Sequence, residues 1–426
     1  MLRFAKNTSS DLDLNNLRVA ILNYVVSKQR SEELLIRIDD TDKESTIEGK
    51  EKEILEILDL FSIEYKRVVA QSENIKYHTG MAMKLLLDKK GFNCFCSEEA
   101  LEQDKQKALQ NNQHYSYSGF CLTISDETKF HCNAPFVVRL KKPEYKVVFK
   151  DQLRGDLEFE PYEVDSIIML KHDKTPTHDF ASGVDDMLYD ISCVIQEEDE
   201  LFNTPKQIHI RKSLGYDKKI EYIHIPKIVT NNHTDSLLVN SLIQQGFLPV
   251  AIVNYLMVLG YETPKEIFTL EDAVKWFDIS KLSLKNEIFD FKRLCAINNE
   301  HLKQIDDLRL SKLLGYADED LGKVAKVYLQ KYDTLVQLKE KIDNIFAVKP
   351  IPQASQEQIL QVKECIQGAP FMPELETLVK YIEAKTALSK EVVEKSLGYL
   401  ITAEEDSIDL GQIYVYIRNY LGEIVK

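Results

Sequence analysis

The N-terminal part of the chain alternates between short apolar runs and amphipathic helix patterns, and this alternation restricts the fold most. In "LNNLRVAILNYVVSKQR" (14–30) the apolar residues fall three or four apart, which predicts a helix with one buried stripe. "ELLIRID" (33–39) is a nearly continuous apolar run, typical of a strand covered on both faces. A second helix pattern follows Ser45 and Thr46, either of which can cap it. This order predicts a doubly wound α/β fold with a parallel sheet.

The sequence changes character twice after this part. From about residue 91 a cysteine-containing polar stretch leads into the strand-like runs "APFVVRLKK" and "YKVVFKDQL", which predict an antiparallel α+β insertion. Beyond residue 226 the pattern is mostly helical, so an all-α C-terminal region is expected. A chain of 426 residues is too long for one core. We expect a Rossmann-like domain at 1–90 and 179–225, an insertion at 91–178, and helical domains at 226–295 and 296–426.

Composition narrows the class of protein. No apolar run approaches the ~20 residues that cross a bilayer, and the start "MLRFAKNTSS" has no secretory pattern, so no membrane association is expected. Seven unevenly spaced cysteines form no disulfide framework and favour a reducing, cytoplasmic location. A net charge of -15 argues against indiscriminate binding to nucleic acid, and no DNA partner is expected. A local basic groove stays compatible with this charge.

Several stretches, in order along almost the whole chain, resemble bacterial glutamyl-tRNA synthetases, which are class I aminoacyl-tRNA synthetases. They are "RFA", "NLRVAILNY", "RIDDTDKEST", "FCSEEAL", "PTHDFASGVDDMLYDIS", "NTPKQIHIRKSLG" and "GFLPVAIVNYL". The resemblance implies a Rossmann-like catalytic domain, with 91–178 as the acceptor-stem-binding insertion. It further implies a stem-contact domain at 226–295 and an anticodon-binding domain at 296–426.

The first signature of that family, a His-Ile-Gly-His-type motif, falls here on Asp13, Leu14, Asn15 and Asn16. In the family, glycine lets ATP approach the backbone at a helix N-terminus. At its position Asn15 is expected to obstruct the nucleotide. A carboxylate ~4 Å from a phosphate oxygen costs about 4 kcal/mol per unit charge at an effective dielectric of 20. We therefore expect Asp13 to cap the helix and ATP binding to be lost.

The second and third signatures also depart from the family. The Lys-Met-Ser-Lys-type loop corresponds to "KIVTNNHTDSLLVNSLIQQ", whose only basic residue, Lys227, lies at the wrong end. The resemblance maps the glutamate-binding residues of the family onto Arg3, Asp39, His178 and Gln196, and only Arg3 is unchanged. Gln196 replaces a guanidinium that grips a carboxylate with two hydrogen bonds. The acidic "QEEDE" that it begins is expected to add negative charge around the pocket.

The resemblance also implies a metal site, because some members of the family bind zinc in the insertion through Cys-x-Cys and Tyr-x-x-x-Cys. The corresponding ligands are Cys94, Cys96, Tyr117 and Cys121, with Tyr117 the weakest of them and His131 and Cys132 in reserve. The alternative is that these are unconnected residues of a reduced protein. We expect a structural zinc that holds the insertion together.

These departures lead to one main functional prediction and two alternatives. The main prediction is a catalytically inactive paralogue of glutamyl-tRNA synthetase that acts as a binding, scaffold or regulatory protein. It would bind a protein partner or, with weakened affinity, tRNA. The first alternative is a divergent but active glutamate–tRNA ligase, and the second is a non-catalytic module that binds tRNA or other RNA.

Overall fold

The computed structural model describes residues 1–42, 44–112, 114–231, 237–404 and 408–425. The chain forms two compact units. The first comprises Met1–Val239 and Leu256–Phe289, and the second comprises Asn240–Tyr255 and Asp290–Lys426. The segment 226–295 is therefore shared between the two units. None of the helices in the described ranges combines the length and the apolar character needed to span a bilayer.

The first unit is built on a seven-stranded sheet of order β3-β2-β1-β9-β10-β6-β7. Its strands are β1 (Leu2–Asn7), β2 (Leu34–Asp39), β3 (Arg67–Ala70), β6 (Val147–Asp151), β7 (Gly155–Phe159), β9 (Cys193–Glu197) and β10 (Glu221–Ile225). All neighbours are parallel except β6 and β7. The predicted parallel sheet is thus confirmed. The chain winds outward in both directions from the β1–β9 pair, which is the place where such sheets bind ligands.

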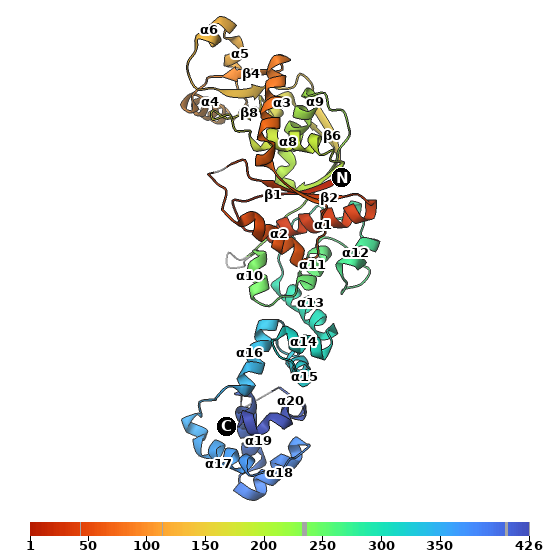
Figure 1. Cartoon of the computed structure of the whole chain (residues 1–426), viewed down its shortest axis with the longest axis vertical. Coiled ribbons are helices and arrows are strands. Elements are labelled where there is room, and N and C mark those ends of the chain that lie inside the picture. The colour runs from red at the N-terminus through yellow and green to blue at the C-terminus, as the bar shows by residue number, and fades with distance from the viewer. Residues whose placement is uncertain (43, 113, 232–236, 405–407, 426) are drawn as a thin grey trace. The chain divides into compact units, whose positions relative to one another are not determined.

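Helices cover both faces of this sheet (Figure 1). On one face lie α1 (Leu14–Arg30) and α2 (Lys50–Leu60), and on the other lie α3 (Ile75–Leu87), α8 (His178–Leu188) and α9 (Thr204–Ser213). The predicted first helix and second strand coincide with α1 and β2. The predicted caps of the second helix are wrong: α2 begins after Gly49, whose φ of 79° suits glycine, and Thr46 donates instead to the Asp42 carbonyl.

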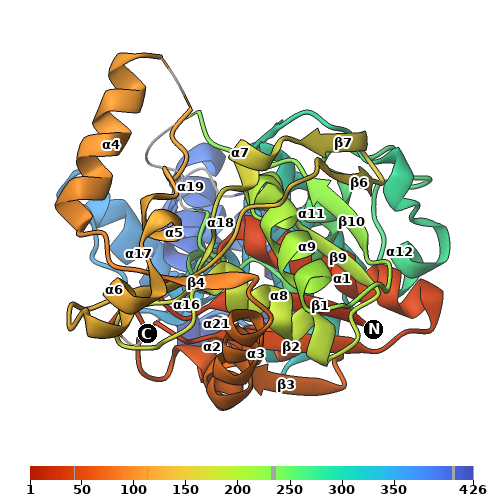
Figure 2. The same cartoon turned by 90° about the horizontal axis from the view of Figure 1, so that it is seen from above.

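The insertion contains a three-stranded antiparallel sheet of order β4-β5-β8 (Gly91–Cys94, Val137–Leu140, Ile168–Leu170). Around it lie α4 (Glu98–Gln110), α5 (Phe120–Thr123), α6 (Asp126–His131) and α7 (Pro161–Val164). "APFVVRLKK" forms β5 as predicted. "YKVVFKDQL" differs, because its strand β6 lies beside β10 in the large sheet, as Figure 2 shows. Val147 and Phe149 on β6 pack into the core of the first unit, which explains this placement.

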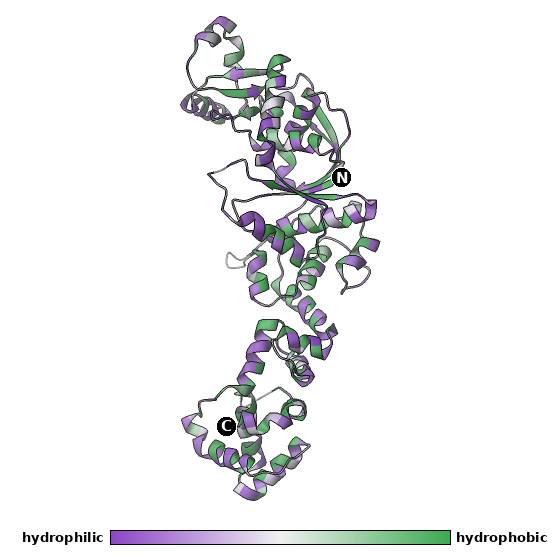
Figure 3. Cartoon of the chain, viewed as in Figure 1, coloured by the Kyte–Doolittle hydropathy of each residue, from purple (hydrophilic) through white to green (hydrophobic). Residues whose placement is uncertain are grey.

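The rest of the chain is mostly helical, as predicted, and hydrophilic and hydrophobic residues alternate along its helices (Figure 3). The helices are α10 (Val239–Gln244), α11 (Pro249–Val258), α12 (Leu270–Trp276), α13 (Phe291–Gln304), α14 (Asp307–Leu313), α15 (Glu319–Tyr328), α16 (Leu335–Phe346), α17 (Gln356–Gln367), α18 (Leu375–Thr386), α19 (Lys390–Thr402), α20 (Leu410–Ile417) and α21 (Leu421–Ile424). Two short strands, β11 (Ile228–Val229) and β12 (Glu287–Ile288), pair in parallel. Single 3-10 turns are η1 (Gln71–Asn74), η2 (Glu198–Phe202), η3 (Ile279–Lys281), η4 (Gln353–Ser355) and η5 (Arg418–Tyr420).

Candidate functional site

A cavity of about 220 Å³ lies where the sheet changes winding direction. The carboxyl ends of three parallel strands line it: Lys6 and Asn7 on β1, Asp39 on β2, and Gln196 and Glu197 on β9. This edge is where open parallel sheets hold their ligands. All four predicted amino-acid-pocket positions, from Arg3 to Gln196, line this one cavity.

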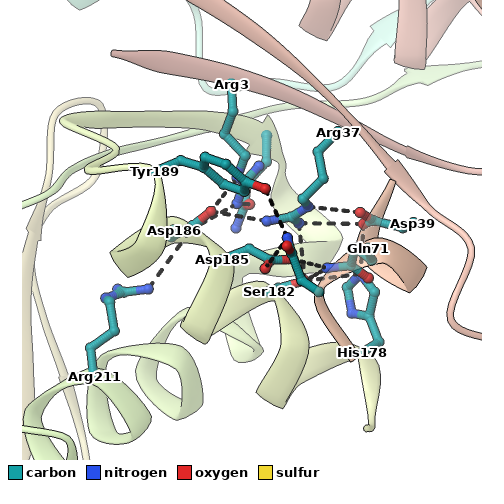
Figure 4. Close-up of polar contacts among 12 residues, drawn as sticks. Arg3, Arg37, Asp39, Gln71, His178, Ser182, Asp185, Asp186, Tyr189 and Arg211 are labelled. Carbon is teal, nitrogen blue, oxygen red and sulfur yellow. Dashed lines mark hydrogen bonds and ion pairs between the residues drawn. The ribbon is translucent and has the colours of Figure 1, made fainter. Parts of the chain in front are cut away.

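The floor of the cavity is a buried ion-pair network around Asp186 on α8 (Figure 4). Arg3 Nε donates to Asp186 Oδ1 at 2.8 Å, and Arg37 Nη1 donates to the same oxygen at 3.0 Å. All three side chains are at most 4% exposed. Although burial opposes the shift, the guanidinium groups of Arg3 and Arg37 hold the pKa of Asp186 below its ordinary value. The carboxylate therefore keeps two arginines charged and fixed at the cavity.

Arg37 also orients the rim of the cavity. Its Nε and Nη2 donate to the two oxygens of Asp39 at 2.7 and 3.3 Å, a fork that matches a carboxylate. His178 Nε2 lies 3.2 Å from Asp39 Oδ2, and its side chain is half exposed. Despite burial, Asp39 raises the pKa of His178 above its ordinary value, and Arg37 lowers that of Asp39. Asp39 is thus held between the Arg37 guanidinium and the His178 imidazole.

Gln196 is held by groups on both sides. Its Oε1 accepts from Arg3 Nη2 at 3.4 Å, and its Nε2 lies 3.0 Å from His224 Nε2 and 3.1 Å from Thr204 Oγ1. His224 Nδ1 is in turn 2.7 Å from the buried carboxylate of Asp151. Sequence reasoning missed Asp151 and His224, which have no motif and meet only because β6 pairs with β10. Gln196 stands where the family has an arginine that binds the ligand. Here its amide contacts Arg3 instead.

The four motif positions at the start of α1 do not lie together in the cavity. Asp13 caps the helix as expected, accepting from Asn16 N at 2.8 Å, and Leu14 is buried. Asn15 exchanges two hydrogen bonds with the backbone of Ile228, at 2.7 and 3.2 Å, and does not line the cavity. The hydrogen bonds to Ile228 on β11 hold the Asn15 side chain away from this cavity. Only Asn16 lines the cavity, and it donates to Glu197 at 2.8 Å.

Basic residues from other segments neutralise part of the negative charge of the acidic stretch after Gln196. Lys227 pairs with Asp199, and Arg154 pairs with Glu198 at 2.7 Å. The position of Lys227 thus brings a positive charge to the cavity rim. Burial, and after it the charge of Asp13, raises the pKa of Glu197 above its ordinary value. Residues 232–236 of the loop compared with the Lys-Met-Ser-Lys-type loop lie outside the described part of the chain.

Lys6 is a cavity cation that sequence reasoning missed. Its side chain is 7% exposed, lines the cavity and donates to Ser10 Oγ at 3.0 Å. No carboxylate among the described residues lies within ion-pair distance of it. Burial lowers its pKa, although Asp13 and Glu197 oppose the shift. Its place at the end of β1, directly before the polar loop, was the available signal.

The predicted zinc ligands converge in the insertion. The sulfurs of Cys94, Cys96 and Cys121 lie within 4.8 Å of one another. Cys96 Sγ is 3.5 Å from Cys121 Sγ, and Tyr117 Oη is 3.4 Å from Cys94 Sγ and 3.6 Å from Cys96 Sγ. Tetrahedral zinc with sulfur ligands at ~2.3 Å and an oxygen ligand at ~2.1 Å requires S···S and S···O separations of about 3.8 and 3.6 Å.

The reserve ligands are less well placed for such a site. Cys132 is exposed, and neither it nor His131 belongs to the thiol group found among the described residues. Burial raises the pKa of Cys96 to about 12, so without a metal this thiol stays protonated at neutral pH. The four side chains at 94, 96, 117 and 121 fit a tetrahedral zinc, which would bind thiolates and tie the end of β4 to α5.

Comparison with known proteins places this geometry in context. Residues 1–296 match the family model described as class I tRNA synthetases (E and Q), catalytic domain. The chain is 45% identical to a glutamate–tRNA ligase 2 of Sulfurimonas denitrificans and 43% identical to a glutamate–tRNA ligase 1 of Nitratiruptor. A Campylobacter jejuni glutamate–tRNA ligase 1 is 42% identical. Each alignment covers the whole of both chains.

A solved structure agrees with the fold along the full length. The crystal structure of a glutamate–tRNA ligase from Elizabethkingia meningosepticum, in complex with its amino acid, superposes with a TM-score of 0.82. It covers 100% of this chain and 98% of the other chain at 19% identity. The sheet, the insertion and the helical region described above therefore recur together in that protein.

These findings correct the main functional prediction. An inactive binding or scaffold protein is contradicted by relatives that match over the full length and are named as ligases. The loss of ATP binding likewise has no support. The physical reasoning failed because it counted charges only at motif positions. The structure turns Asn15 away, pairs Asp199 with Lys227, and places Lys6 in the cavity.

Proposed function

This chain belongs to the class I glutamyl-tRNA synthetase family, and we propose that it is an active glutamate–tRNA ligase, which joins glutamate to tRNA at the expense of ATP. The observation that carries the proposal is whole-length identity of 42–45% to proteins named for this activity. The cavity at the β1–β9 switch point supports it, because it retains fixed cations and anions at strand ends.

The charges of the cavity complement those of glutamate, which has one ammonium and two carboxylate groups. Arg3, fixed by Asp186 and Gln196, presents a guanidinium for one carboxylate. Asp39, held by Arg37, offers an anion for the ammonium group. Because these groups are already held by protein partners, little ordering is needed when the substrate binds.

Lys6 is the residue that we assign to the phosphates of ATP. It lines the same cavity, forms no ion pair with any described residue, and follows the strand that leads into the loop before α1. A cation in a partly water-excluded site stabilises the charge that develops as pyrophosphate departs. In the family that the sequence resembles, lysines of a mobile loop supply this positive charge. In this chain Lys6 supplies part of it.

The tRNA is the macromolecular partner that this activity requires. The resemblance of the sequence to this family implies that the insertion contacts the acceptor end. A zinc bound by Cys94, Cys96, Tyr117 and Cys121 would supply rigidity there rather than chemistry. We propose the domain boundaries at residues 90, 178, 225 and 295 on the same basis.

The direct test is aminoacylation of tRNA with labelled glutamate by the full-length chain. We expect glutamate- and ATP-dependent charging, and ATP–pyrophosphate exchange when glutamate and tRNA are both present. Arg3→Gln is expected to abolish charging, whereas Lys66→Gln, an exposed lysine outside the cavity, is the matched control. Absence of charging with tRNA from a native source, by protein whose folding is verified, would contradict the proposal.

A further inference from the structure

A second, larger cavity of about 570 Å³ lies beside the first residues of β10, between α9 and the β6–β7 hairpin. It shares no lining residue with the cavity at the β1–β9 switch point. Its volume falls within the range of small-molecule sites, about 300–1,000 Å³. The activity proposed above gives this cavity no role.

The lining of this cavity is basic in a chain whose net charge is -15. Five cationic side chains line it: Lys150, Arg211, Lys212, Lys218 and Lys219. The carboxylates that line it are those of Asp156, Asp217 and Glu221. Three of these charged groups already have ion-pair partners that do not line the cavity: Lys218 with Asp190 at 2.6 Å, Glu221 with Arg30 at 2.9 Å, and Arg211 with Asp186 at 3.7 Å. A surplus of positive charge is therefore left for a ligand.

Among the described residues, Lys150 and Lys219 are the two cations of this set with neither an ion pair nor a ring contact, since Lys212 lies 3.8 Å from the centre of the Tyr145 ring. Neither forms an ion pair with any residue in the described ranges. Asp156 stands opposite Lys150 in the β6–β7 pairing, yet the two side chains do not pair. Unpaired lysines on the wall of a concave site concentrate anions there, because low-dielectric walls focus the field.

Arg211 on α9 adds a buried guanidinium to the same cavity. It is 3% exposed, and its Nη2 donates to Tyr222 Oη. Its Nη1 is buried and forms no hydrogen bond within the described part of the chain. The nearest carboxylate, Asp186, is 3.7 Å away and already binds Arg3 and Arg37 at 2.8 and 3.0 Å (Figure 4). A buried guanidinium with so distant a counter-ion is an incomplete anion partner.

We propose that this cavity binds a small molecule with two or more phosphate groups. Lys150 and Lys219 contact the phosphates from the rim, and Arg211 supplies positive charge from the wall. Tyr216 and Tyr222 form an aromatic side of the cavity, suited to a planar group on the ligand. The proposal does not depend on ligase activity.

Calorimetric titration of the full chain with pyrophosphate tests the site. Lys150→Gln combined with Lys219→Gln should weaken binding by about tenfold or more, since two charge contacts are lost. Both side chains are exposed, so the fold is expected to persist. Lys76→Gln with Lys105→Gln, an exposed pair outside both cavities, should bind as the unaltered chain does. Equal affinity in the two double variants would overturn the proposal.

Pyrophosphate also fits the proposed ATP site, so the location needs its own readout. Acylation of lysines followed by mass spectrometry should show pyrophosphate protecting Lys150 and Lys219, and Lys6→Gln should leave that protection unchanged. Protection that disappears in Lys6→Gln would assign the binding to the first cavity and overturn the proposal. Protection of Lys150 and Lys219 by RNA but not by pyrophosphate would overturn it as well, because the phosphates would then belong to a macromolecule.

Discussion

Two buried polar clusters of the first unit differ in what completes them. Around Asp186, arginines and carboxylates from β1, β2 and α8 neutralise one another within hydrogen-bond distance. In the insertion, Cys94, Cys96 and Cys121 meet Tyr117, and the guanidinium of Arg139 lies 4.5 Å from the centre of the Tyr117 ring. The first cluster contains both signs of charge, whereas the second contains mainly electron-pair donors. The first is neutralised by its own members, whereas the second offers ligand atoms that could hold a metal cation.

The largest expected effect tests the metal half of this comparison. Cys94→Ser combined with Cys96→Ser should remove a zinc ion from each chain, because two of four ligands are lost. Structural zinc contributes about 10 kcal/mol or more in small metal domains. Residues 91–178 should lose protection against amide exchange while the large sheet keeps it. Cys132→Ser, at an exposed thiol, should retain the metal. If elemental analysis finds no metal in the unaltered chain, purified without chelator, then the cysteine cluster, like the cluster around Asp186, is complete without a metal ion.

The next effect tests whether the charged cluster is complete in itself. Asp186→Ala leaves the guanidinium groups of Arg3 and Arg37 buried without their shared partner, and this should lower the free energy of unfolding by about 3–5 kcal/mol. Glu56→Ala removes an exposed ion pair with Lys52 within α2 and should cost about 1 kcal/mol or less. Urea titration followed by circular dichroism measures both. If the two variants lose similar amounts of unfolding free energy, then the buried network around Asp186 contributes no more to stability than an exposed ion pair.

A smaller effect separates function from stability in the first cavity. Lys6 forms no ion pair among the described residues, so Lys6→Gln should leave stability nearly unchanged. We expect kcat/KM for charging to fall about tenfold to hundredfold, which corresponds to about 1.4–2.7 kcal/mol of transition-state stabilisation. Lys52→Gln, on the exposed side of α2, is the control. If kcat/KM is undiminished in Lys6→Gln, the assignment of Lys6 to the phosphates of ATP is wrong.

The sequence predicted those features that depend on local pattern. The stripe of α1, the buried run of β2 and the convergence of Cys94 with Cys121 follow from spacing or from the resemblance. Contacts between distant segments could not be predicted in this way. Asn15 turns toward Ile228, a residue 213 positions away, and this contact alone decides whether its side chain enters the cavity.

The electrostatics of the cavity could not be predicted for the same reason. Counting charges at motif positions treated Lys227 as misplaced, whereas the fold pairs it with Asp199 at the rim. Lys6 belongs to a strand, and its contribution becomes visible only when β1 ends beside β9. The net charge of a pocket depends on which strand ends meet, and one sequence read alone does not report this.

The smallest effect concerns His178, the half-exposed member of the charged cluster. Because Asp39 raises its pKa above the ordinary 6.5, its contribution to stability is complete below pH 6.5 and is lost as pH rises through the raised value. Solvent screening limits this contribution to about 0.5 kcal/mol. Urea titrations at pH 6 and pH 8.5 should show this loss in the unaltered chain and in His172→Gln, at an exposed histidine, but not in His178→Gln. An equal pH dependence in all three proteins would show that His178 lies outside the network.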